Sequence, residues 1–84
     1  MKMSKEAYNI LTNDVINVMK LDIVPGVINS LKANTKIKNP YIAFIWQIYF
    51  YVTNRNTVLR DMINKENLFD KHIETAMKTI ITKI

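Results

Sequence analysis

The chain has 84 residues, of which 49% are hydrophobic and 23% charged, and its formal net charge is +5. This length and composition are typical of one small globular domain, so we expect residues 1–84 to form a single helical domain. The absence of cysteine excludes disulfide frameworks and thiol catalysis, and the single glycine excludes glycine-rich phosphate loops.

Isoleucine, asparagine and lysine are abundant and together supply 33 of the 84 residues. Codon bias in an AT-rich genome, as in many phages and viruses, produces such a composition. Because the lysines partly reflect this bias, the positive charge gives little support for an anionic partner. No apolar leader segment is visible, which predicts a cytoplasmic protein.

The first predicted helix runs from about Ser4 to Lys20. Ser4 is a suitable N-cap residue, and Glu6 follows in the first turn, where a negative charge favours the helix dipole. Apolar residues then recur at the spacing of one helix face: Ala7, Tyr8, Leu11, Val15, Val18 and Met19. The pattern predicts an amphipathic helix packed along one side.

A second helix is predicted from roughly Asp22 to Asn34, with Asp22 as the N-cap residue. Pro25 then lies in the first turn, where its missing amide costs no hydrogen bond. An alternative interpretation is a turn at Pro25 and Gly26, with the helix beginning one turn later. In either case a short basic loop separates this helix from the next one.

Asn39 followed by Pro40 is a start signal for the third helix, because asparagine caps helices and proline suits the first helical position. The next segment, 41–52, has eleven apolar or aromatic residues and one exception, Gln47. As a helix it is apolar on every side and must be covered by its own fold, a partner or lipid. Its residues would also suit a strand. We favour a helix, because no second strand of similar quality is present to pair with it.

A short amphipathic segment follows at 57–65, and it either forms its own helix or continues the central one. Its apolar side is formed by Val58, Leu59, Met62 and Ile63. The last helix is predicted to open at Asn67, because Asn67 and Asp70 have the spacing of a capping box. Its apolar residues recur at helical spacing: Phe69, Ile73, Ala76, Met77, Ile80 and Ile84.

These segments predict an all-α fold, a small bundle of four to five helices around a central hydrophobic helix at about 40–53. The connections between helices are short. Short connections favour antiparallel packing of helices that follow one another in the chain.

Three roles are compatible with the central helix: core of the bundle, docking surface for a protein, or contact with a membrane surface. The uncharged segment 39–54 is about 24 Å long as a helix, which is short of a hydrocarbon core of about 30 Å. Aromatic residues dominate the energetics of protein interfaces. The candidate partner-binding residues are therefore Phe44, Trp46, Tyr49, Phe50 and Tyr51.

The basic residues suggest nucleic-acid binding as an alternative function. If the interhelical connections converge on one side of the bundle, a phosphate-binding patch is formed by Lys32, Lys36, Lys38, Arg55 and Arg60. The aromatic residues that could stack on bases are not interleaved with these cations. A solvated basic surface is therefore the favoured interpretation.

Glu66, Asp70 and Glu74 recur every four residues, which predicts a solvated acidic face on the last helix. His72 lies about 200° around that helix from Asp70, so the two do not share a face as a metal site requires. No nucleophile lies in a catalytic turn motif. We therefore expect no enzymatic activity and no cofactor or metal.

The expected function is that of a small, non-enzymatic protein-binding module, a regulator or inhibitor of the kind that phages and viruses encode. Its expected partner is a larger protein or a second copy of the chain, with a dimer favoured. Nucleic-acid binding and peripheral membrane association are the alternatives.

Overall fold

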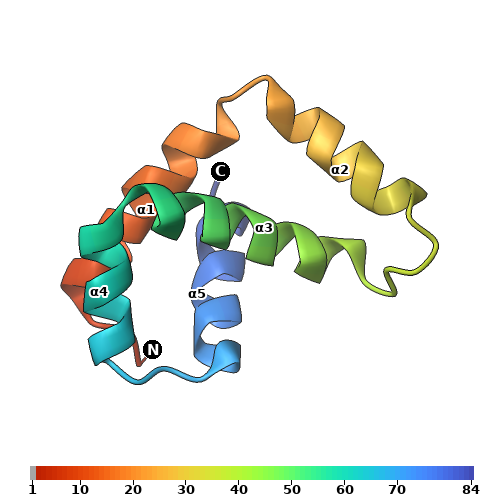
Figure 1. The fold of residues 1–84 in the computed structure, drawn as a ribbon. Helices are drawn as coiled ribbons and strands as arrows, with labels where there is room; N and C mark the ends of the chain where they lie inside the picture. Colours follow the sequence, from red (N-terminus) through yellow and green to blue (C-terminus); the bar gives the residue numbers. More distant parts are fainter. Residues whose placement is uncertain (1) are drawn as a thin grey trace.

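The computed structural model describes residues 2–84, and in that range the chain forms five helices and no strand (Figure 1). The helices are α1 (Lys5–Met19), α2 (Ile23–Ala33), α3 (Pro40–Arg55), α4 (Thr57–Lys65) and α5 (Asp70–Thr82). The predicted all-α class, a small bundle with a hydrophobic helix at its centre, is confirmed.

Two helices begin where the sequence predicts, because a polar side chain caps each of them. The Ser4 hydroxyl oxygen accepts the amide hydrogen of Ala7 at 3.2 Å, and Asn39 Oδ1 accepts that of Ile42 at 3.2 Å. Pro40 is the first residue of α3, as expected. Each cap provides a partner for an amide that the first helical turn leaves unpaired.

Helix α2 begins at Ile23, with Pro25 in its first turn. The more N-terminal of the two predicted start points is therefore confirmed. Asp22 precedes the helix as expected, but its side chain forms no capping hydrogen bond.

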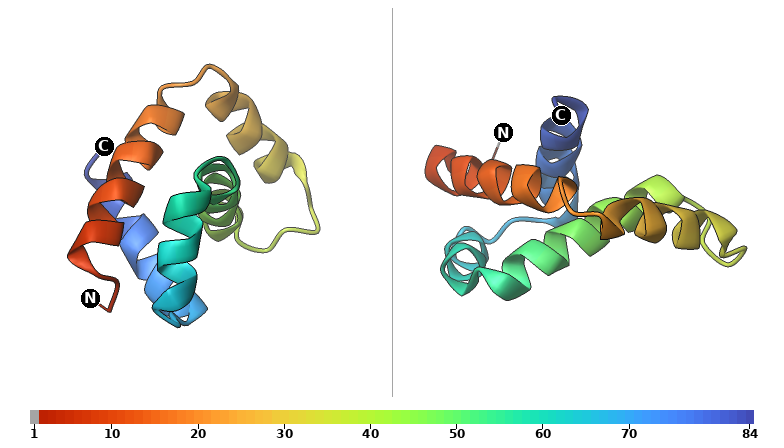
Figure 2. Two further views of the ribbon diagram at one scale, coloured as in Figure 1. Left: turned by 60° about the vertical axis from the view of Figure 1, so that its left-hand side comes forward. Right: turned by 90° about the horizontal axis from the view of Figure 1, so that it is seen from above.

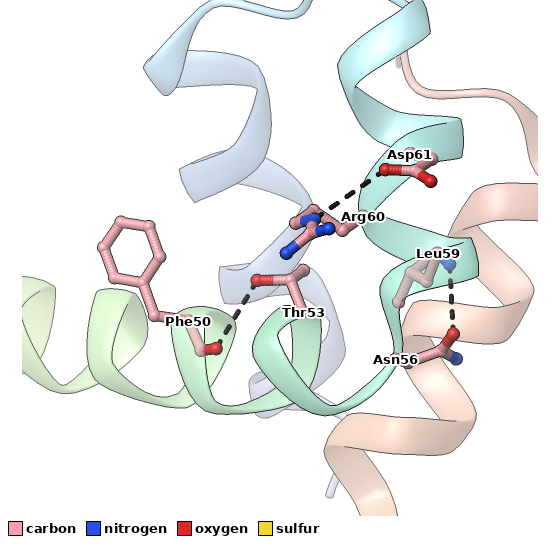
Figure 3. Close-up of polar contacts among 6 residues, drawn as sticks. All are labelled: Phe50, Thr53, Asn56, Leu59, Arg60 and Asp61. Carbon is pink, nitrogen blue, oxygen red and sulfur yellow. Dashed lines mark hydrogen bonds and ion pairs between the residues drawn. The ribbon is translucent and has the colours of Figure 1, made fainter.

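Asn56 separates α3 from α4, so the segment at 57–65 is a helix of its own. The Asn56 amide donates to the Val52 carbonyl at 2.9 Å and completes α3, whereas its side-chain oxygen accepts the Leu59 amide at 3.0 Å and starts α4. The backbone at Asn56 is not helical, with φ −111° and ψ 88°. As a result α4 leaves α3 at a steep angle (Figures 1 and 3).

Helix α3 lies at the centre of the fold and packs against each of the other four helices (Figure 2). Helix α1 packs against three helices, because it contacts α4 and α5 as well as α3. The largest fully buried side chains come from α1, α3, α4 and α5: Leu11, Val15, Ile45, Leu59, Met77 and Ile80. Burial of each such side chain contributes about 1.5–3 kcal/mol to folding.

The predicted antiparallel packing of sequential helices is wrong for two pairs. Among the described residues, α1 shares no substantial contact with α2, and α4 shares none with α5. Figure 1 shows α2 turning away from α1, and a loop separating α4 from α5. A short connection permits antiparallel packing but does not require it, and the apolar surface of α3 attracts all four helices instead.

The predicted start of the last helix at Asn67 is also wrong. Asn67 has a left-handed backbone, with φ 52°, and lies just beyond the end of α4. Asparagine tolerates this conformation better than most residues, so it ends a helix as readily as it starts one. The N-cap residue of α5 is Phe69, whose amide donates to His72 Nδ1 at 3.1 Å. Only half of a capping box is formed, because a phenyl ring offers no acceptor.

Candidate functional site

The five predicted partner-binding residues lie on different sides of α3. Phe44 and Tyr49 are each only 6% exposed, so both belong to the core and offer little surface to a protein partner. Trp46 and Tyr51 are half-buried, and Phe50 is 53% exposed. The structure therefore does not unite the five in one docking surface.

Trp46, Tyr49 and Phe50 form an aromatic cluster beside α5. The ring of Trp46 lies 5.5 Å from the ring of Tyr49, edge to face, and 5.5 Å from that of Phe50. The indole Nε1 donates to Glu74 Oε2 on α5 at 3.0 Å. Burial, and secondly the negative charge of Asp70, raise the pKa of the Tyr49 phenol. The cluster holds α3 against α5 by packing and one charge-assisted hydrogen bond.

The acidic residues do not form the solvated face that the sequence predicted. Glu74 accepts the Trp46 bond, and Glu66 lies between α4 and α5 rather than on α5. The two carboxylate oxygens of Glu66 accept the amide and the hydroxyl of Ser4, each at 2.7 Å. Residues four positions apart share a face only when they lie in one continuous helix. The chain is not helical between Glu66 and the start of α5 at Asp70, so Glu66 does not share a face with the acidic residues of α5.

The exposed Phe50 projects from α3 above a turn whose polar groups are already paired (Figure 3). The hydroxyl of Thr53, which is 3% exposed, donates to the Tyr49 carbonyl at 2.9 Å and lies 3.5 Å from the Phe50 carbonyl. The ring of Phe50 therefore offers apolar surface without a polar group to orient a ligand.

A concave surface lies on the other side, between α1 and the junction of α3 with α4. This docking groove has a volume of about 660 Å³. Its lining residues are Asp14, Asn17, Val18, Leu21, Tyr51, Val52, Arg55, Asn56, Thr57 and Val58. One wall is the C-terminal half of α1, and the other is the end of α3 with the first turn of α4.

One hydrogen bond joins the two walls of the groove, and one cation–π contact lies within the α3 wall. Asn56 Nδ2 donates to Asp14 Oδ2 at 2.9 Å, which ties the start of α4 to α1. The guanidinium carbon of Arg55 lies 5.2 Å from the ring centroid of Tyr51, a cation–π contact. In the part of the chain that the structure describes, Arg55 has no carboxylate within ion-pair distance. The groove therefore presents one guanidinium, Arg55, and one carboxylate, Asp14, that do not form an ion pair with each other.

Exposed apolar side chains gather at this groove. Leu21 is 41% exposed and Val58 is 69% exposed, and both line it. Ile23, 56% exposed, lines an adjoining hollow that shares Val18 and Tyr51 with the groove. Three of the large hydrophobic residues that are exposed thus lie close to one Tyr–Arg pair.

The sequence alone does not predict that the exposed apolar residues of this groove form a site. Helical spacing predicts Val58 on the apolar, packed side of its helix, and the structure corrects this because α4 turns that residue outward at the junction. Leu21 lies in the connection between α1 and α2, outside any periodic pattern. The sequence does indicate Tyr51 and Arg55. It places Tyr51 among the candidate partner-binding residues, however, and Arg55 among the candidate phosphate-binding residues.

The five basic residues form two groups at opposite ends of α3. Lys32, Lys36 and Lys38 precede its first residue, whereas Arg55 ends α3 and Arg60 lies on α4. Sixteen residues of helix separate the groups by about 22 Å. The interhelical connections therefore do not converge, and the five do not form one phosphate-binding patch. Arg60 is instead paired with Asp61 at 3.8 Å (Figure 3).

The described residues contain neither a metal site nor a membrane-spanning helix. No group of three or more His, Asp or Glu side chains among them is arranged to hold a metal ion, and none of their helices has the length and hydrophobicity needed to cross a bilayer. Comparison with known proteins gives no match: no family model, curated protein or solved structure is significantly similar to the chain.

Proposed function

We propose that the protein is a non-enzymatic binding module that holds a segment of another protein in the docking groove. The observation that carries this proposal is the Tyr51–Arg55 pair between the exposed side chains of Leu21 and Val58. Tyrosine and arginine are enriched among the residues that dominate interface energies. Aliphatic neighbours add apolar area that a partner buries.

The chemistry of the groove defines the segment that it accepts. Leu21 and Val58 favour apolar side chains, and the unpaired guanidinium of Arg55 favours a carboxylate nearby. We therefore assign as occupant an amphipathic segment that carries an acidic residue next to aliphatic ones. Such a module regulates or inhibits the protein that it captures.

A selection experiment tests the proposal and requires no identified partner. Peptides are selected from a random library on the full-length protein, and their sites are mapped by nuclear magnetic resonance of the backbone amides. We expect the selected sequences to combine an acidic residue with aliphatic ones, and the perturbed amides to be those that line the groove.

Arg55 and Val58 are both exposed, so substitutions at these positions should leave the core intact. Arg55→Glu and Val58→Asp should each weaken binding by about tenfold or more, as for residues near the centre of an interface. Arg60→Glu is the matched control, because it makes the same charge change outside the groove. Peptides that bind Arg55→Glu and the control equally well, or that perturb the amides of Trp46 and Glu74 in the aromatic cluster instead of those of the groove, would contradict the proposal.

Self-association as a dimer stays a prediction, and the exposed ring of Phe50 offers apolar surface of α3 for it. Light scattering on the native protein and on Phe50→Asp measures this directly. A dimer lost only in Phe50→Asp places the self-contact on the aromatic side, whereas a dimer lost only in Val58→Asp makes a second copy the occupant of the groove.

A further inference from the structure

A second pocket, distinct from the docking groove, lies where α1, α2, α3 and α5 approach one another. Its volume is about 300 Å³. Its lining residues are Met19, Ile28, Lys32, Pro40, Tyr41, Phe44 and Ile81. The lining is apolar apart from two groups, the ammonium of Lys32 and the hydroxyl of Tyr41. The pocket is thus an apolar hollow with one cation in its lining.

The arrangement of the helices explains why this space is not filled by the protein. Helix α2 packs against α3, but it makes no substantial contact with α1 or α5. Figure 1 shows α2 extending away from α1, with the C-terminal end of α5 behind α3. The apolar side chains of the four helices therefore converge without closing on one another. Apolar atoms that border an empty space lose packing energy, which an apolar ligand restores.

One lysine lines the pocket, and two more lie in the loop that leads to it. Lys32 lines it and is exposed, and it has no carboxylate within ion-pair distance among the described residues. Lys36 and Lys38 lie in the loop that leads to Pro40, which also lines the pocket. No acidic residue contributes to the lining. A ligand with an anionic head is therefore favoured over a neutral or cationic one.

We propose that this pocket binds a medium-chain fatty acid, with its alkyl tail between Phe44 and Ile81 and its carboxylate beside Lys32. An engineered apolar cavity of about 150 Å³ holds one benzene, so a pocket of twice that volume accommodates on the order of ten to twelve carbon atoms. Decanoate matches both the volume and the charge. This site does not depend on the proposed docking of a protein partner, because it lies at the other end of α3.

Isothermal titration calorimetry of the full-length protein with decanoate, below its micellar range, tests the proposal. Decanol and decyltrimethylammonium have similar tails with a neutral and a cationic head. We expect decanoate to bind most tightly and to perturb the backbone amides of the pocket residues. Absence of decanoate binding, equal binding of the cationic amphiphile, or perturbation confined to the docking groove would overturn the proposal.

Variants of the lining separate the contributions of tail and head. Ile81→Trp and Ile28→Trp each place an indole in the pocket from a half-buried position, and either one, once circular dichroism shows it folded, should abolish binding. Lys32→Gln should weaken decanoate binding by about two- to fivefold, as expected for an exposed ion pair, whereas Lys65→Gln on α4 should not. Unchanged affinity in a folded indole variant would refute the site, and equal effects of the two lysine variants would refute the assigned head group.

Discussion

Trp46 connects the aromatic cluster of α3 to α5, and its contacts predict how two substitutions differ. The indole is half-buried, touches Tyr49 edge to face, and donates its only hydrogen bond to Glu74 on α5. Trp46→Phe keeps an aromatic ring but removes the donor. Trp46→Ala removes the ring as well.

The magnitudes follow from these contacts. Loss of a hydrogen bond to a charged acceptor costs about 1.5–3 kcal/mol, and the half-exposed carboxylate of Glu74 regains water, so we expect about 1 kcal/mol for Trp46→Phe. Removal of a fully buried aromatic side chain costs about 3–5 kcal/mol, and half burial of Trp46 reduces this to about 2–3 kcal/mol for Trp46→Ala. Phe50→Ala, at an exposed position of the same cluster, should cost only about 0.5 kcal/mol.

Urea unfolding followed by far-UV circular dichroism measures each free energy of unfolding without relying on the tryptophan signal. A double-mutant cycle of Trp46→Phe with Glu74→Ala isolates the hydrogen bond, and we expect a coupling energy of about 1 kcal/mol. Additive effects in this cycle would show that the bond between α3 and α5 does not stabilise the fold. A larger loss for Phe50→Ala than for Trp46→Ala would refute the assignment of Trp46 to the packed side.

Three further predictions concern the ends of helices. Glu66→Ala removes both bonds to Ser4, and we expect a loss of about 1 kcal/mol of unfolding free energy in urea. Asn67→Ala should cost about 1 kcal/mol because alanine disfavours the left-handed backbone, while Asn67→Gly should equal or exceed the native stability. Partial burial, and then nearby lysine charges, lower the pKa of His72. On acidification the unfolded chain therefore binds a proton before the native protein does, so stability should fall as the pH drops below about 6.5.

The predictions for His72 and Asn67 each have a matched control. In the His72→Gln variant the loss of stability just below about pH 6.5 should disappear, because the chain has no second histidine. The same pH dependence in the native protein and the variant would assign the effect to carboxylates. A glycine at position 67 that destabilises the protein would show that Asn67 contributes through its side chain and not through its backbone.

The parts of the fold that sequence could predict are those fixed within one or two helical turns. Ser4, Asn39 and Pro40 act on backbone groups three residues away, so their effect is visible in the local pattern. The hydrophobic segment 41–52 also indicates the central helix, because a helix that is apolar on every side has few stable positions other than the centre of a domain.

The parts that could not be predicted depend on residues distant in the chain or on the angle at a junction between two helices. Glu66 pairs with Ser4 across 62 positions, and no local pattern indicates that contact. Val58 has the spacing of a packed residue, yet the steep junction at Asn56 turns it outward. Both residues of the docking groove that carry its exposed apolar surface, Leu21 and Val58, lie at junctions of this kind.

The two candidate sites share one side of α3, and this shapes how their variants must be interpreted. Phe44 in the apolar pocket and Tyr51 in the docking groove are seven residues apart, nearly two helical turns, so they lie on the same side about 10 Å from each other. Between them, Val24 and Val27 of α2 line a small hollow with Ile48 and Tyr51. A substitution that displaces α2 would therefore disturb both sites at once. A pocket variant that loses decanoate but keeps the selected peptide acts by occupying the pocket. Loss of both ligands in a variant that circular dichroism shows to be folded indicates a wider displacement that includes α2.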